Sequence, residues 1–380
     1  MNNAIIFENA SVVLADDVAH GWVAVHDGVI VETGAGKAPE RGEDLNGDYL
    51  IPGLVELHTD HLESHYSPRP GVKWNRMGAV MAYDAQIAAS GITTVFDSLR
   101  AGSDVDGGGF GPELMALGEA LQQARDAGLL RCDHLTHLRC EIPSIDVLEA
   151  VGAFAARYPV GLMSLMDHTP GQRQFRDIDK YLQYYCGKSG KSVEAVRGEI
   201  CRKQAVSSDV GPANRRALTA LARQLGTPIA SHDDTTVDDV SQSVAEGVAL
   251  AEFPTTLEAA GACREHGVTV MMGAPNLVRG GSHSGNIAAA DLARAGLLDI
   301  FSSDYVPASL LMAAFHLPEA APNISLPQAI ATVTRNPARA TGLHDRGEIR
   351  TGLRADLARV TMMGETPVVR QVWRGGRRIS

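Results

Sequence analysis

Short apolar stretches alternate with helix-like amphipathic stretches through most of the chain. Segments 51–57, 92–96 and 268–274 are rich in Ile, Val, Leu and Met. This alternation is typical of βα units that build a parallel sheet. The apolar runs end near His58, Leu99, Glu141, His168, His232, Phe253, Pro275 and Asp304. We therefore predict an α/β fold, a closed (β/α)8 TIM-like barrel over residues 49–352, with its chemistry at the carboxyl ends of the strands.

Both ends of the chain follow a different pattern. Segments 4–14, 22–34, 355–362 and 366–373 resemble short strands, which are broken by turn residues such as Asp16-Asp17 and His26-Asp27-Gly28 and end on Gly375-Gly376. Such clusters of glycine and aspartate are typical of the turns between strands. We expect the two ends to meet in one small composite β-sandwich made of residues 1–48 and 353–380.

Composition and charge restrict the partners and the compartment. The 380 residues contain 34 Lys plus Arg and 45 Asp plus Glu, so the net charge is −11. An acidic, evenly spread charge argues against nucleic acid and against an anionic membrane surface. No apolar stretch reaches the roughly 18 residues of a membrane-spanning helix. The five cysteines form no C-x-x-C pair, and residues 1–10 lack a secretory pattern, so we expect a cytoplasmic protein.

The first apolar run leads directly into a dense group of metal-binding residue types. The segment 51–65, IPGLVELHTDHLESH, carries His58 and Asp60 at the end of its strand, on one face by strand alternation. Buried imidazoles and carboxylates need a compensating positive charge, and a divalent metal ion supplies one. The alternative is that these side chains end the strand and face water.

Four other strand ends offer candidate ligands. Glu141 is expected to bridge two ions, because neither its run nor the next contains a lysine that could be carbamylated; the alternative is an ion pair with Arg139 or with a cation on a neighbouring strand. His168 is a candidate for a second ion, or a histidine bonded to backbone. His232 is a candidate ligand, or a core residue. His134 and His137, on the third run, are expected to be hydrogen-bonded residues of the barrel wall. Asp304 is expected to bind the ion and to accept the proton of a bound water.

Basic and hydroxyl residues in the loops near these strand ends are candidates for phosphate contacts. They comprise two loop cations after the first strand, two arginines after the fourth and a glycine-rich loop after the seventh. The two arginines begin the longest excursion between strands, residues 171–227, and loops this long on the catalytic face of a barrel are commonly lids. Exposed backbone amides and guanidinium groups suit phosphate oxygens. For each, the alternative is a solvated side chain or a flexible turn. The candidates are Arg69, Lys73, Arg173, Arg176, Arg279, Ser282 and His283.

Several strings resemble a known family. IPGLVELH at the first strand, the strand-five histidine, the strand-eight aspartate and the ending from Asn336-Pro337-Ala338 to Ala355-Asp356-Leu357 resemble the amidohydrolase superfamily over nearly the whole chain. HTDHLESH-x-x-PRPGVKW, HLRCE, DHTPGQRQF, SHDDTT, EFPTT and GAPN-x-x-RGGSHSGN look like its phosphonate-metabolism branch, the PhnM family. The strand-one pattern His-x-Asp, and Glu252 where strand six usually has a histidine, depart from the superfamily.

This resemblance implies a function that composition and spacing do not. The implied protein is a metal-dependent hydrolase of the carbon-phosphorus lyase pathway, which cleaves α-D-ribose 1-methylphosphonate 5-triphosphate to the 5-phosphate and pyrophosphate. It would use one or two divalent ions, with zinc expected first and manganese or iron as alternatives. Hydrolysis of a cyclic amide or deamination, and a non-catalytic barrel scaffold, are the competing hypotheses. The sequence leaves the oligomeric state open, a homo-oligomer included.

Overall fold

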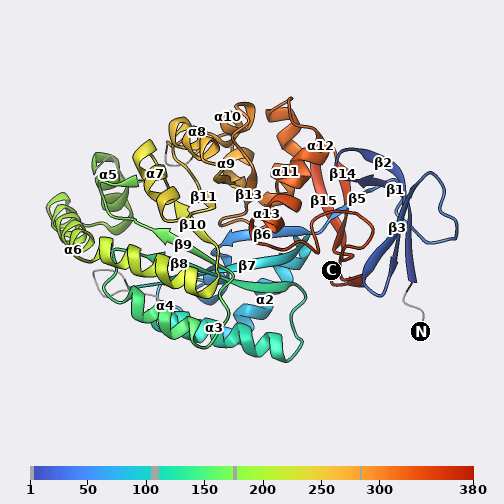
Figure 1. Cartoon of the computed structure of the whole chain (residues 1–380). Coiled ribbons are helices and arrows are strands. Elements are labelled where there is room, and N and C mark those ends of the chain that lie inside the picture. Colours follow the sequence, from blue (N-terminus) through green and yellow to red (C-terminus); the bar gives the residue numbers. More distant parts are fainter. Residues whose placement is uncertain (1–3, 104–110, 174–177, 283–284) are drawn as a thin grey trace.

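A computed structural model describes residues 4–103, 111–173, 178–282 and 285–380. Eight parallel strands, β6 to β13, pair in chain order to form a nearly closed barrel (Figure 1). Each ends within two residues of its predicted position, which confirms the barrel prediction. The strands are β6 (Leu54–Thr59), β7 (Ile92–Ala101), β8 (Asp133–Glu141), β9 (Leu162–Met166), β10 (Ile229–His232), β11 (Leu250–Glu252), β12 (Thr269–Gly273) and β13 (Ile300–Ser302).

The seam between β6 and β13 is closed mainly by a side chain. Only an isolated bridge between Thr59 and Asp304 pairs the two backbones there, among the residues that the structure describes. The fully buried Glu56 carboxylate instead accepts the backbone N–H groups of His58 on β6 and Ser303 after β13, both at 2.6 Å. Burial raises the pKa of Glu56 to about 7. One acidic side chain therefore joins the first and last strands.

Helices cover the outside of the barrel (Figure 1). They are α1 (His61–Tyr66), α2 (Arg76–Ala89), α3 (Gly111–Asp126), α4 (Val147–Ala155), α5 (Ile178–Ser189), α6 (Val193–Leu225), α7 (Val237–Ala245), α8 (Leu257–Glu265), α9 (Ala274–Val278), α10 (Ala289–Arg294), α11 (Ser309–Ala320), α12 (Leu326–Ala331) and α13 (Arg335–Ala340). Among the described residues, no helix is both long enough and apolar enough to cross a membrane.

The strings SHDDTT and EFPTT place helix starts directly after strand ends. Thr236 caps α7: its hydroxyl accepts the backbone N–H of Asp239, and the Asp239 carboxylate accepts the backbone N–H of Thr236. Thr256 caps α8 by accepting the N–H of Ala259. Caps of this type satisfy N–H groups that have no partner inside the helix. The caps therefore fix where each helix begins relative to the polar residues at the end of the preceding strand.

The long segment after β9 is helical, whereas the sequence interpretation treated residues 171–227 as a loop excursion of the kind that forms lids. Helices α5 and α6 occupy most of it. The first half of α6 packs with α5 around a separate apolar cluster. Further along α6, the buried Asn214 amide donates to the backbone carbonyls of Ile142 and Ser144 at 2.9 and 2.8 Å. The end of α6 is thus anchored to the barrel.

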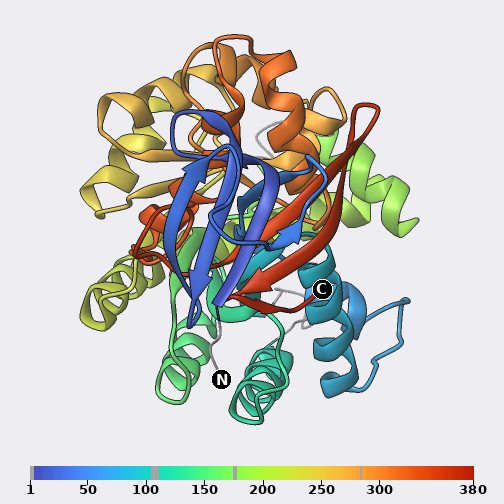
Figure 2. The ribbon, with the colours of Figure 1, turned by 90° about the vertical axis from the view of Figure 1, so that its right-hand side faces the viewer.

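Strands from both termini meet in a second, mainly antiparallel sheet at one side of the barrel (Figure 2). It contains β1 (Ala4–Val13), β2 (Val18–His26), β3 (Val29–Ala35), β4 (Glu43–Asp44), β5 (Tyr49–Pro52), β14 (Leu357–Met363), β15 (Thr366–Arg374) and β16 (Arg377–Arg378). The termini meet as expected, but in one continuous sheet rather than in two facing sheets. The domain boundaries at 48/49 and 352/353 remain a prediction.

Gly53 marks the passage from this sheet into the barrel. It separates β5 from β6 and its N–H donates to the carbonyl of Asp356 at 2.8 Å. A Cβ atom added at Gly53 would lie 2.4 Å from the Thr93 hydroxyl oxygen. Only glycine allows this close approach of the two layers.

A buried charged network ties the barrel wall together. The His134 ring on β8 lies with Nδ1 3.0 Å from both Asp97 carboxylate oxygens and with Nε2 3.2 Å from Asp84 Oδ1 on α2. The prediction that His134 is a hydrogen-bonded wall residue is confirmed. Burial alone would lower the pKa of His134, but the two carboxylates raise it to about 9. His134 is therefore a cation in the folded protein at neutral pH.

This network predicts a loss of stability in mildly alkaline solution. A histidine with a pKa near 6.5 when unfolded and about 9 when folded contributes fully below 6.5, and the contribution disappears as the pH rises through 9. We expect the free energy of unfolding to fall by on the order of 3 kcal/mol between pH 6.5 and 9.5. Urea unfolding across this range measures it. His134→Gln should flatten the dependence; an unchanged pH slope in that variant would contradict the assignment.

Candidate metal centre

A cavity of about 300 Å³ lies at the carboxyl ends of the barrel strands. Its lining includes His58, Arg139, His168, His232 and Asp304, which come from five different strand ends. Parallel strands in a barrel bring their carboxyl ends to one rim. The rim predicted from the sequence thus carries a polar pocket.

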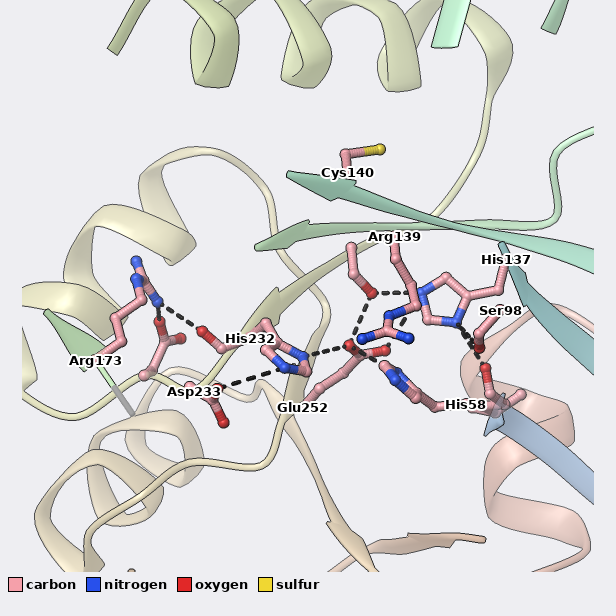
Figure 3. Close-up of polar contacts among 12 residues, drawn as sticks. His58, Ser98, His137, Arg139, Cys140, Arg173, His232, Asp233 and Glu252 are labelled. Atoms are coloured by element: carbon pink, nitrogen blue, oxygen red, sulfur yellow. Dashed lines mark hydrogen bonds and ion pairs between the residues drawn. The ribbon is translucent and has the colours of Figure 1, made fainter. Parts of the chain in front are cut away.

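Two imidazoles and one carboxylate form a compact donor group at this rim (Figure 3). His58, His232 and Glu252 are all buried, and each offers one ligand atom within 4.8 Å of the other two. Glu252 Oε2 lies 3.1 Å from His58 Nδ1 and 3.0 Å from His232 Nδ1. Three nitrogen and oxygen donors at this spacing are a typical protein ligand set for a divalent ion.

A second donor group shares His232. It consists of His168, His232 and Asp233, again within 4.8 Å of one another. Asp233 Oδ2 lies 3.4 Å from His232 Nε2, on the opposite side of the ring from Glu252. The His168 and His232 ring centroids are 5.4 Å apart.

The unsatisfied atoms of the first group fit a bound cation. His58 Nδ1 and Glu252 Oε1 are buried and make no hydrogen bond with the described residues. Burial alone would lower the pKa of His58, but the Glu252 carboxylate raises it above its ordinary value. Burial would raise the pKa of Glu252, but His58 above all holds it well below its usual range. A buried carboxylate that stays ionised and keeps an oxygen free is suited to a metal ion.

Neighbouring polar residues hold Glu252 in place. The Ser164 hydroxyl donates to Glu252 Oε2 at 2.8 Å and also contacts His137 Nε2. The other ring nitrogen of His137 lies 2.9 Å from the carbonyl oxygen of Leu57. Burial lowers the pKa of His137 to about 3, so the ring is neutral. The prediction that His137 is a hydrogen-bonded wall residue is confirmed, and the residue supports the carboxylate.

Three non-glycine residues at the strand ends have left-handed backbone conformations. Asp233, Phe253 and Asp304 have φ values of 56°, 57° and 53°. Such conformations cost about 1–3 kcal/mol each and persist where the surrounding structure imposes them. Their occurrence after β10, β11 and β13 places local strain around the pocket.

Asp60, Glu141 and Asp304 belong to neither donor group, although Glu141 contacts His168 of the second. Asp60 precedes α1, and its Oδ2 lies 3.4 Å from Arg139 Nη1. Glu141 lies 2.8 Å from His168 Nδ1 and 3.7 Å from Arg100 Nε, and His168 above all counteracts the effect of burial and lowers the pKa of Glu141 to about 2. Arg100 is a cation on the neighbouring strand β7, so its contact with Glu141 corresponds to the ion-pair alternative that the sequence left open. Asp304 lines the pocket, and burial raises its pKa.

Three pocket residues were outside the predicted site. Glu252 was noted only as a departure on the sixth strand, although a glutamate ending an apolar strand is itself a signal. Asp233 follows His232 directly, but nothing in the sequence shows its left-handed conformation. Arg139 alternates with Glu141 on β8 and was considered only as an ion-pair partner.

Most predicted phosphate contacts lie away from the cavity. Arg69 is exposed, and the Lys73 ammonium donates to Ser67 Oγ at 3.0 Å. The buried Arg173 guanidinium bonds the His232 carbonyl at 2.9 Å and contacts the Asp234 carboxylate. Arg173 thus anchors the end of β10.

The glycine-rich loop contributes in part. Ser282 lines the cavity, and Arg279 is exposed just beyond α9. Arg176 and His283 lie outside the described residues. Contacts between these side chains and phosphate stay predictions.

Comparisons with solved structures show the fold. N-Isopropylammelide isopropylaminohydrolase from Burkholderia multivorans aligns with a TM-score of 0.65 and 17% identity, covering 99% of this chain and 97% of that one. 5-Methylcytosine deaminase from Klebsiella pneumoniae aligns with a TM-score of 0.65 and 16% identity, covering 99% and 98%. Both alignments include the barrel and the terminal sheet.

Sequence comparisons show the family. Residues 210–379 match the model described as the amidohydrolase family. The chain is 26% identical to imidazolonepropionase from Deinococcus deserti, covering 96% of this chain and 92% of that one. It is 44% identical over 378 residues to α-D-ribose 1-methylphosphonate 5-triphosphate diphosphatase from Escherichia coli K12, covering 99% of this chain and 100% of that enzyme. The chain therefore belongs to the amidohydrolase family and, within it, to the family of that Escherichia coli diphosphatase.

Proposed function

We propose that this protein hydrolyses α-D-ribose 1-methylphosphonate 5-triphosphate to the 5-phosphate and pyrophosphate, in the cytoplasm. The observation that carries the proposal is the 44% identity to the Escherichia coli diphosphatase across the full length of both chains. The pocket supports it with nitrogen and carboxylate donors beside the half-buried Arg139. Water adds to the α-phosphorus, the bond from that phosphorus to the bridging oxygen breaks, and pyrophosphate leaves.

His58, His232 and Glu252 would hold one divalent ion. His168 and Asp233, which form the second group with His232, mark the place for a second. Zinc fits imidazole and carboxylate donors first, and manganese or iron are alternatives. A bound ion of this kind would lower the pKa of a water molecule toward 7 and so supply a nucleophile at neutral pH.

Asp304 is proposed as the proton acceptor. Its carboxylate lines the cavity, and burial raises its pKa above the ordinary value, which makes it a better base. Its backbone N–H donates to the His58 carbonyl at 3.1 Å, so the acceptor and a metal ligand are held by the same seam. The position suits transfer of the proton from the attacking water.

Arg139 is proposed to bind the phosphoryl group under attack. It lines the cavity, its Nε is buried without a hydrogen bond among the described residues, and its nearest carboxylate oxygen is the Asp60 Oδ2 already described at 3.4 Å. The register of β7 and β8 places Arg100 beside it. A guanidinium group with free N–H donors matches phosphoryl oxygens and stabilises charge in the transition state.

Replacing Arg139 with alanine should lower kcat/KM for the triphosphate about 100- to 1000-fold and leave metal content unchanged. Added guanidinium chloride at millimolar concentration should restore part of the rate. Arg69→Ala, which removes an exposed cation outside the cavity, is the matched control and should change kcat/KM less than threefold. Equal losses in the two variants would argue against a specific role for Arg139.

Phosphorus NMR of the purified protein with the triphosphate substrate and added zinc or manganese tests the function. We expect pyrophosphate and the 5-phosphate in equal amounts, dependent on metal. Release of orthophosphate would refute the proposed bond cleavage. Ammonia release from cyclic amides or amino-heterocycles, without pyrophosphate, would establish the alternative amidohydrolase chemistry, and no turnover of either class would favour the scaffold hypothesis.

A further inference from the structure

A second cavity, of about 600 Å³, lies at the opposite end of the barrel from the metal centre. It is lined by the chain around Asp133, where β8 starts, whereas the metal centre lies where β8 ends. Nine strand residues separate these ends by about 26 Å. The far wall is the turn between β15 and β16 of the terminal sheet, so the cavity lies between the sheet and the barrel.

The lining of this cavity is strongly basic. Six arginine side chains contribute to it, and Asp133 is the only acidic residue in the described lining. The whole chain has a net charge of −11, so the local excess of positive charge runs against the overall composition. The arginines, which we call the arginine pocket, are Arg125, Arg131, Arg346, Arg374, Arg377 and Arg378.

Asp133 cannot neutralise these cations. Its carboxylate already accepts from Arg346 at 2.8 Å, from Arg374 at 3.2 Å and from Arg354, outside the lining, at 2.7 Å. Burial would raise the pKa of Asp133, but the three guanidinium groups lower it below its usual range. Asp345 also pairs with Arg346 and Asp84 with Arg131, whereas Asp133 is the only carboxylate in contact with Arg374 among the residues that the structure describes.

The outer arginines have even fewer acidic partners. Arg378 Nε donates to the backbone oxygen of Ser380 at 3.0 Å. The Arg377 side chain makes no hydrogen bond or ion pair with any residue that the structure describes, and both side chains are exposed. Their guanidinium donors are available to a ligand with several anionic oxygens.

We propose that the arginine pocket binds a small polyphosphate anion, with Arg374, Arg377 and Arg378 as the principal contacts. A concave site of this volume suits a small molecule better than the flat surface of an acidic protein. Because its walls come from both the barrel and the terminal sheet, an occupant would join the two. This inference is independent of the reaction at the metal centre.

Calorimetric titration of pyrophosphate into the metal-loaded protein tests the proposal, with sulfate as a second probe. We expect a binding phase whose Kd rises at least tenfold in Arg377→Ala/Arg378→Ala, while kcat/KM for hydrolysis changes less than twofold. Pyrophosphate should also slow amide hydrogen exchange in residues 374–380 and 128–135, which separates this site from product binding at the metal centre. Arg41→Ala/Arg370→Ala removes two exposed charges outside the lining and should leave the phase intact.

Three results would overturn the proposal. One is a pyrophosphate isotherm that Arg377→Ala/Arg378→Ala leaves unchanged. Another is protection from exchange only at the metal centre. The third is binding of an acidic polypeptide, but of neither small anion, through the same arginines.

Discussion

Replacing Glu252 with glutamine should remove most of the bound metal and lower turnover at least a thousandfold. The carboxylate lies within 3.1 Å of both His58 and His232, and its second oxygen is free. A neutral amide keeps the size of the side chain but loses the charge that raises the pKa of His58 and would attract a cation. Metal analysis of the dialysed variant, together with the phosphorus assay, measures both losses.

The exposed Glu258 on α8 provides the matched control for this prediction. Glu258→Gln makes the same chemical change six residues away and should retain full metal content and turnover. Thermal unfolding should show that Glu252→Gln still folds, because Ser164 can donate to the amide oxygen as it does to the carboxylate. Stoichiometric metal with normal turnover in Glu252→Gln would eliminate this carboxylate as a ligand.

Replacing Asp304 with asparagine should lower kcat by about 100- to 10,000-fold, the usual contribution of a general base. Asparagine tolerates the left-handed backbone at this position, where φ is 53°, so the fold should survive the substitution. Alanine would add backbone strain and is the poorer test. The measurement is kcat across the acidic pH range, where the wild-type rate should fall as Asp304 is protonated and the variant rate should not.

An intact unfolding midpoint and unchanged metal content would assign the loss in Asp304→Asn to proton transfer. A kcat within threefold of wild type, with the same acid limb in the pH profile, would show that another group accepts the proton. The direction of the pH dependence follows from the raised pKa of Asp304: the carboxylate can accept a proton above that pKa and is already protonated below it.

The barrel could be predicted because strand ends are marked twice in this sequence. Hydrophobic runs fix the strands, and polar residues or capping threonines such as Thr236 and Thr256 follow directly. Both signals depend on residues that are close together in the chain, so they can be recognised without knowing the tertiary structure. The long α6 was missed as a unit, because polar residues such as Ser207, Asn214 and Arg215 occupy several of its buried positions, which weakens the apolar periodicity.

The candidate metal ligands were harder to predict than the end of the barrel at which they lie. His58, His168 and His232 meet as expected, but Glu252 and Asp233, rather than Asp60 and Glu141, complete the two donor groups. The selection depends on where each carboxylate points, and cations decide it: Arg139 lies beside Asp60, and Arg100 beside Glu141. Contacts between distant strands cannot be read from spacing along the chain.

The Glu56 side chain that closes the barrel seam has a consequence for how this enzyme can change. It fixes His58 on one strand and Ser303, the neighbour of Asp304, on the other. A backbone ladder tolerates most side-chain replacements, whereas this joint depends on a single carboxylate. Small substitutions around Glu56 therefore offer a route by which evolution can shift the base Asp304 relative to the candidate metal ligand His58 and adjust substrate choice without rebuilding the fold.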